Sequence, residues 1–179
     1  MKRSLVLVAA VAALVGAVTA SVGLLAAPAS SAGTAKPRPG LRLLPPATPA
    51  GQMSLYGHIA SLRRTSGRFE LRFDPAWFTG GVTARRAKRA DTGSSDVPND
   101  NYVVEEGHRL LTFVVPTTAR ITVLTNDGTG ISSTPITVAE LARIVNGGRH
   151  RKLFEPLDSG VWIRVRVDTV REVAQQYRP

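Results

Sequence analysis

The sequence contains no cysteine. This absence excludes disulfide bonds, thiol catalysis, zinc–thiolate sites and lipid attachment through a cysteine. Catalytic signatures are also missing, since no serine lies in a nucleophile-elbow context and no glycine-rich phosphate loop follows an expected strand. The histidines show no paired metal-ligand spacing; they are His58, His108 and His150. We therefore expect a protein that binds rather than catalyses and that needs no cofactor.

Paired carboxylates leave one enzymatic alternative open. A small secreted hydrolase could use two of them as a general acid and a general base. The candidates are Asp74, Asp100 and Glu106.

Lysine is scarce: after residue 3 the only lysines are Lys36, Lys88 and Lys152. The chain is nevertheless strongly basic. The full sequence has 23 Lys and Arg against 13 Asp and Glu, a net charge of +10. Without Lys2 and Arg3, 21 basic residues remain against 13 acidic ones, a net +8. Arginine binds phosphates and carboxylates, so an anionic polymer or a membrane surface is an expected partner. The alternative is a composition that serves solubility alone.

The N-terminus has the layout of a secretory signal over residues 1–32. Lys2 and Arg3 precede an apolar run at 5–15, and small residues lead to Ser30-Ser31-Ala32. The alternative is an uncleaved anchor, because residues 4–27 carry no charge and could span about 30 Å as a helix. Both interpretations place the rest of the chain outside the cytoplasm, where a nucleic-acid partner is not expected.

Residues 33–52 contain five prolines and no apolar periodicity, which predicts an extended linker. Residues 53–179 are long enough for one globular domain. We expect a monomer, because no feature of the sequence indicates an oligomer.

Strand patterns dominate this domain. Phe69, Leu71 and Phe73 alternate with charged residues, and the pair Asp74–Pro75 is expected to end that strand. In the strand 161–167 the odd-numbered residues are expected to point inward. The expected strands cover 53–62, 68–73, 102–104, 109–115, 120–124 and 161–167. A turn at 168–169 and a final strand are expected after them, although the last residues also fit a helix.

Two short helices complete the expected elements. The first covers residues 80–90 with Thr79 as its N-cap. The second has Thr137 and Glu140 as a capping box and Gly147 as its stop. Connections of hairpin length require mostly antiparallel pairs. The sequence predicts a β-rich α+β domain: a curved antiparallel sheet or a partly open barrel, with the oligonucleotide/oligosaccharide-binding type as one form.

Basic residues form two candidate anion-binding segments. One lies on the first helix and the other follows the second helix. Their members are Arg85, Arg86, Lys88 and Arg89, then Arg149, Arg151 and Lys152. If the segments converge they form an anion patch, and if they diverge they are solvated faces. A third alternative is that the acidic loop after the first helix neutralises its charges.

Trp162, Arg164 and Arg166 alternate on the outer face of one expected strand. Such a platform could stack a sugar ring or bind an anionic polymer. In the alternative interpretation Trp162 packs under the second helix, while the arginines extend to water.

A polar stretch without lysine or arginine follows the first helix. Oxygen ligands in such a loop could bind calcium, although the spacing does not match the helix–loop–helix calcium motif. Ordinary turn chemistry is the alternative. The acidic residues are Asp91, Asp96, Asp100, Glu105 and Glu106.

Three stretches resemble a family when they are taken in order. They read FDPAWFTG at 73–80, VPNDNYVV at 97–104 and QQYRP at 175–179. They are similar to the FDPAxWLTG, VPNDYYV and EQYxP patterns of uncharacterised exported proteins of Gram-positive bacteria. The chain departs from them where Asn101 replaces an aromatic residue and where 85–89 is strongly basic. The resemblance implies an extracytoplasmic protein with a single domain, and it assigns no catalytic residue.

The sequence therefore predicts an exported binding or structural module that engages an anionic component of the cell envelope. The hydrolase and a calcium-stabilised structural module remain as alternatives.

Overall fold

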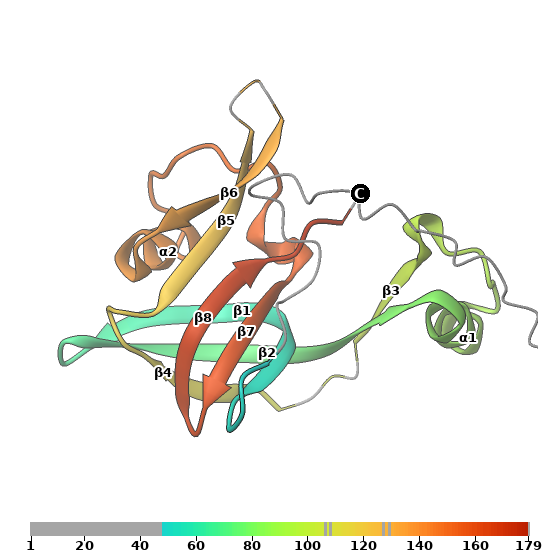
Figure 1. The fold of residues 1–179 in the computed structure, drawn as a ribbon, viewed down its shortest axis with the longest axis horizontal. Coiled ribbons are helices and arrows are strands. Elements are labelled where there is room, and N and C mark those ends of the chain that lie inside the picture. The colour runs from blue at the N-terminus through green and yellow to red at the C-terminus, as the bar shows by residue number, and fades with distance from the viewer. Residues whose placement is uncertain (1–47, 106, 108, 127, 129, 179) are drawn as a thin grey trace, which may run out of the picture. The chain divides into compact units, whose positions relative to one another are not determined.

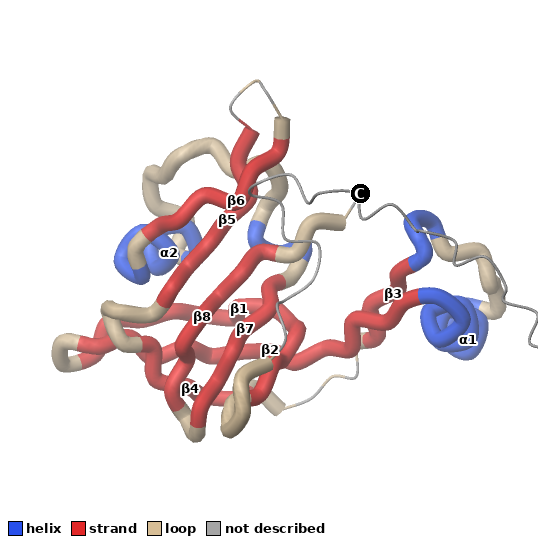
Figure 2. Tube along the Cα trace, viewed as in Figure 1, coloured by secondary structure: helices blue, strands red, loops and turns tan. Residues whose placement is uncertain are grey.

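The computed structural model describes residues 48–178 with the exception of 106, 108, 127 and 129. Its described part contains eight strands and two helices (Figures 1 and 2). The strands are β1 (Met53–Thr65), β2 (Arg68–Gly80), β3 (Asn101–Val104), β4 (Leu111–Val115), β5 (Arg120–Asn126), β6 (Ile131–Ile136), β7 (Val161–Arg166) and β8 (Thr169–Gln175). The helices are α1 (Gly81–Thr92) and α2 (Val138–Val145), and the short 3₁₀ turns are η1 (Pro98–Asp100) and η2 (Leu157–Ser159).

Five strands close into a barrel. β1 pairs with β2, β2 with β4, β4 with β8, β8 with β7, and β7 returns to β1. β8 pairs with β7 along one edge and with β4 and β5 along the other. β4 and β5 run parallel to β8, and all other pairs are antiparallel. β6 extends the sheet beyond β5, and β3 pairs with the far end of β2. The predicted β-rich α+β fold is confirmed, and the barrel is similar to the oligonucleotide/oligosaccharide-binding type.

The barrel interior is filled by the alternating residues that the sequence marks as apolar. Phe73 and Leu71 are almost fully buried, and Ile163 faces them from β7. α2 covers one end of this core with Val138 and Leu141. The predicted cap is present, because the Thr137 hydroxyl accepts a hydrogen bond of 3.1 Å from the backbone N–H of Glu140.

The prediction that β2 ends at Asp74–Pro75 is wrong. β4 pairs with β2 only as far as Phe73, and β3 begins to pair at Trp77. Pro75 therefore lies between two partners, where its missing N–H interrupts no ladder on that side. On the other side Pro75 faces Gly57, whose own position admits no side chain, because a Cβ there would lie 2.0 Å from the carbonyl oxygen of Asp74.

Beyond Pro75, β2 leads into a segment that we call the arm, residues 77–104, which includes α1 and β3 (Figure 1). α1 starts at Gly81, and its N-cap residue Gly80 provides no side-chain hydrogen bond. Thr79, the predicted N-cap, does not cap this helix. Its hydroxyl donates to the carbonyl oxygen of Tyr102 at 2.8 Å and so joins β2 to β3.

Three further details of the strands differ from expectation or decide between alternatives. β6 was not predicted, and it tolerates Pro135 because it is an edge strand that pairs with β5 alone among the described strands. Val167 does not point inward; it lies in the β7–β8 turn with a φ of 54° and is 83 % exposed. The chain then forms a final strand rather than a helix.

The predicted signal over residues 1–32 and most of the predicted linker lie outside the described residues. None of the described helices has the length and apolar character needed to cross a bilayer.

Candidate functional site

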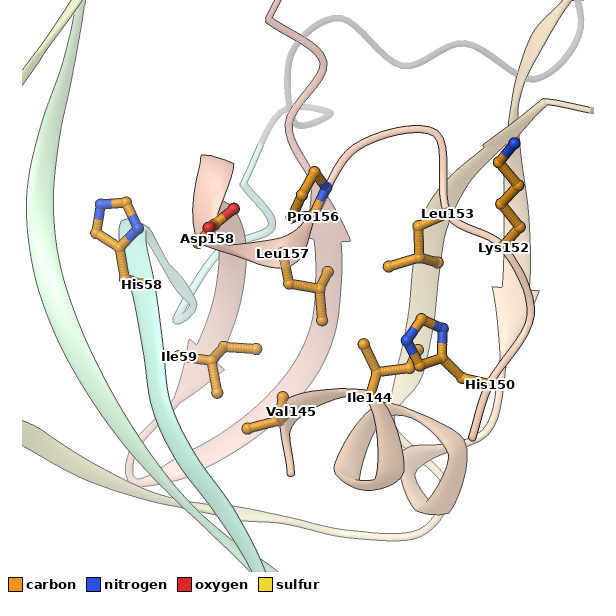
Figure 3. A pocket seen from close by; sticks show the side chains of 10 residues that line it. All are labelled: His58, Ile59, Ile144, Val145, His150, Lys152, Leu153, Pro156, Leu157 and Asp158. Carbon is orange, nitrogen blue, oxygen red and sulfur yellow. The ribbon is translucent and has the colours of Figure 1, made fainter. Parts of the chain in front are cut away.

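The candidate site is a groove of about 670 Å³ between β1, α2 and the segment that precedes β7. Figure 3 shows the side chains that line it. They are His58, Ile59, Ile144, Val145, His150, Lys152, Leu153, Pro156, Leu157 and Asp158. The volume falls within the range of about 300–1,000 Å³ that is usual for ligand pockets.

The groove exists because β7 and β1 pair over a short distance. β7 follows β1 only to Gly57, so from His58 onward the described strands leave this edge of β1 without a partner. α2 lies along the same edge, and the Asn146 side chain donates to the carbonyl oxygen of Leu62 at 3.1 Å. Ile144 and Val145 at the end of α2, together with Leu157, give the groove an apolar floor (Figure 3).

One end of the groove is acidic. His58 Nε2 lies 2.8 Å from Glu105 Oε1, and Asp74 is the cross-strand neighbour of His58. Asp158 lies beside His58 in Figure 3. The carboxylates at this end of the groove are therefore Glu105, which is paired with His58, and Asp158.

The other end of the groove is basic. His150 and Lys152 line it, and both are exposed (Figure 3). Arg151, between them, is turned to Glu140, with 2.8 Å between Arg151 Nε and Glu140 Oε1. Lys152 has no carboxylate partner among the residues that the structure describes.

Two of the four basic residues predicted on the first helix are engaged by the loop that follows it. Arg85 forms an ion pair with Asp100 at 2.9 Å, and Lys88 donates to the backbone carbonyl of Asp96. Arg86 and Arg89 are exposed. The alternative of partial neutralisation by the acidic loop thus describes α1 best.

The two predicted basic segments do not converge. α1 contacts β2 and β3, whereas α2 contacts β1 and β5. In Figure 1 the two helices lie on opposite sides of the barrel.

Arg149 of the second basic segment is exposed, and the structure brings together three other arginines that the sequence did not indicate. Arg63, Arg64 and Arg143 line a shallow depression of about 390 Å³ between the β1–β2 hairpin and α2. The signal that could have found them is the concentration of arginine at the hairpin tip together with an arginine on the exposed face of the second helix. We name Arg63, Arg64 and Arg143 the α2 basic surface.

The predicted platform on β7 is not formed. Arg164 is only 6 % exposed, because it is ion-paired with Glu172 on β8, and Glu172 also lies 3.1 Å from Arg120 on β5. Arg166 remains exposed near the β7–β8 turn. The prediction that Arg164 could reach an external anion beside the tryptophan is therefore wrong.

Trp162 packs into an aromatic cluster rather than under the second helix. Its ring lies 5.2 Å from that of Tyr56 and 6.0 Å from that of Phe78, and its Nε1 donates to Gln176 Oε1 at 2.7 Å. A cavity of about 240 Å³ lies beside the cluster, with the exposed Trp77 at its edge. Burial raises the pKa of Tyr56, with Arg178 opposing the shift.

The acidic residues proposed as calcium ligands have separate partners. Asp91 accepts from the Tyr102 hydroxyl, a hydrogen bond that raises the pKa of Tyr102, while Asp100 binds Arg85 and Glu105 binds His58. Asp96 uses its backbone carbonyl. Within the described residues no group of three or more metal-binding side chains is found.

The carboxylates proposed for catalysis lie in different elements, with Asp74 on β2 and Asp100 in η1. The third one, Glu106, and also His108 are outside the described residues. Asp74 is the cross-strand neighbour of His58, but it is not among the residues that line the groove.

No protein family, curated protein or solved structure matches this chain. Its function must therefore be argued from its own residues.

Proposed function

We propose that this chain is an exported, non-catalytic binding module whose α2 basic surface engages an anionic component of the cell envelope. The expected signal at residues 1–32 and the resemblance to exported proteins support the location. The observation that carries the proposal is the depression in which Arg63, Arg64 and Arg143 come together from the hairpin and from α2.

These arginines are available to an external anion. Arg63, Arg64 and Arg143 are exposed, and none has a carboxylate partner among the residues described in the structure. Glu70 is the cross-strand neighbour of Arg63 and offsets part of the charge.

The geometry favours a polymer with repeated anionic groups. One guanidinium group can donate two parallel hydrogen bonds to the oxygens of one phosphate or carboxylate. Several guanidinium groups spread over one face therefore suit a polymer with repeated anionic groups better than a single ion. Binding through exposed charges must weaken with salt, because the screening length is about 8 Å at physiological ionic strength.

The test compares two triple variants of the purified protein that lose the same charge. The first is R63Q/R64Q/R143Q. The control, R86Q/R89Q/R171Q, removes exposed arginines of α1 and β8 that also lack a carboxylate partner within the described part of the chain. Binding is measured by co-sedimentation with isolated bacterial envelopes and by titration with poly(glycerol phosphate), each over a salt series.

We expect the first variant to bind about tenfold more weakly at low salt, since each exposed contact contributes about 0.2–1 kcal/mol, and the control to stay within about twofold of the wild type. Equal losses in both variants would reduce the effect to net charge and refute the α2 basic surface. Binding that is absent at low salt would refute the envelope partner itself.

A further inference from the structure

The charges at the two ends of the groove have opposite sign. Asp158 and the His58–Glu105 pair lie at one end, and Lys152 and His150 lie at the other (Figure 3). Between them the walls are aliphatic. A ligand that complements this groove carries a positive group, an apolar middle and a negative group, in that order.

The β1 edge supplies a second and independent feature. From His58 onward, β1 pairs with β2 on one side, while the described strands provide no partner on the side of the groove. An unpaired strand edge offers backbone N–H and C=O groups to the end of a peptide that reaches it. The edge is short, because a register shift interrupts the ladder between Ile59 and Ser61 and Asn146 already occupies the carbonyl of Leu62.

We propose that the groove binds a short extended peptide with apolar side chains and two free termini. The peptide extends across the groove, with its N-terminal end at the edge of β1 at His58–Ile59 (Figure 3). Its C-terminal carboxylate faces Lys152 and His150, its N-terminal ammonium faces Asp158, and its side chains contact the floor formed by α2 and η2. This inference does not depend on the proposed function of the α2 basic surface.

A fatty acid or another anionic amphiphile fits the groove less well. Its carboxylate would suit Lys152, but its methyl end would lie against Asp158 and Glu105 and remove water from these carboxylates. Burying a charge without a partner is costly, whereas an ammonium group at the same place provides the partner.

The experiment titrates the purified protein with the tripeptide Val-Leu-Val in its free, N-acetylated, C-amidated and doubly blocked forms. Binding is followed by calorimetry and by the imidazole proton resonances of His58 and His150, which are few enough to resolve because the chain contains three histidines. Dodecanoate serves as the competing ligand class.

Three variants locate the termini. K152Q removes the basic end, D158N removes the acidic end, and R86Q on α1 is the control; all three side chains are replaced by neutral ones of similar size, and Lys152 and Asp158 are exposed, so the fold is retained. We expect each blocked terminus to weaken binding by about two- to fivefold, as is usual for exposed ion pairs. In K152Q the effect of amidation disappears while that of acetylation persists, and in D158N the pattern is reversed.

Other outcomes overturn the proposal. Blocking the termini without loss of affinity would exclude recognition of both charged ends. Dodecanoate that displaces the peptide and binds equally well to D158N would make the groove a site for amphiphiles. No binding of any ligand at millimolar concentration, with unchanged imidazole resonances, would exclude a ligand site of this kind.

Discussion

The barrel and the arm use similar side chains in different ways. In the barrel and α2, one continuous apolar core holds the strands together, with Phe73, Leu71 and Ile163 almost fully excluded from solvent. In the arm, α1 buries only Ala84, and exposed polar contacts such as Arg85–Asp100 connect it to its loop. The stability of the molecule should therefore depend on the barrel, while the arm should open locally at lower cost.

The same comparison explains where basic charge is available. In the arm, Arg85 and Lys88 are bound by acceptors on the loop that follows α1, while Arg86 and Arg89 stay exposed. On the barrel, the hairpin and α2 bring arginines together without an equal number of carboxylates. A count of charges along the sequence cannot separate these two situations, because it does not show which acceptors lie near each basic side chain.

The largest expected effect on the free energy of unfolding comes from breaking one ion pair in each region. E172Q leaves the buried Arg164 without its carboxylate and should lower the free energy of unfolding by about 3–5 kcal/mol. D100N in the arm breaks the exposed pair with Arg85 and should cost about 0–1 kcal/mol. Urea unfolding of both variants measures the difference. Equal costs would show that the arm and the barrel are stabilised in the same way.

A smaller effect on the free energy of unfolding is expected from substitutions at the N-termini of the two helices. T137A removes the cap of α2 and should cost about 0.5–2 kcal/mol, with faster amide exchange at Glu140. T79A is the matched control before α1. It removes the hydrogen bond to Tyr102 and should leave exchange in the first turn of α1 unchanged, since Thr79 does not cap that helix. Faster exchange there would assign Thr79 the role that the sequence predicted.

The parts of the fold that the sequence predicted correctly are those in which local pattern and burial agree. Phe69, Leu71 and Phe73 alternate and are buried, and the Thr137 cap follows from two residues three positions apart. The sequence predicts a turn at 168–169 followed by a last strand, and the β7–β8 hairpin confirms this prediction.

The errors arise where tertiary partners decide the outcome. The sequence predicts a strand end at Pro75, but a proline is tolerated where β4 has stopped and β3 has not begun. Arg164 alternates like an outer residue, yet β8 places Glu172 directly opposite. No pattern in a single strand reveals such a partner.

The groove could not have been predicted for the same reason. It depends on the point at which β7 stops pairing with β1, and on the return of the segment 150–158 past the end of α2. His58 and His150 share no metal-ligand spacing in the sequence, and the closure of the barrel brings both to the lining of one groove. The predicted export signal remains a prediction, because residues 1–32 lie outside the described part of the chain.

The smallest expected effect concerns two tyrosines, Tyr56 in the barrel and Tyr102 in the arm. Burial raises the pKa of Tyr56 above its ordinary value of 10.0, and the hydrogen bond to Asp91 raises that of Tyr102. The unfolded chain therefore loses these protons at lower pH than the folded protein. The resulting stability is fully present below about pH 10 and is lost as the pH rises through the higher pKa values of the folded state.

Removing each hydroxyl separates the two contributions. Y56F should make the decline of unfolding free energy above about pH 10 shallower, because the group is buried and solvent screens it little. Y102F should change the slope less, because that hydroxyl is exposed to solvent in the arm. Urea unfolding between about pH 9 and pH 11 gives both slopes relative to the wild type. A larger change in Y102F would mean that the arm, rather than the barrel, governs alkaline stability, which would contradict the division of the molecule into a tightly held barrel and a weakly held arm.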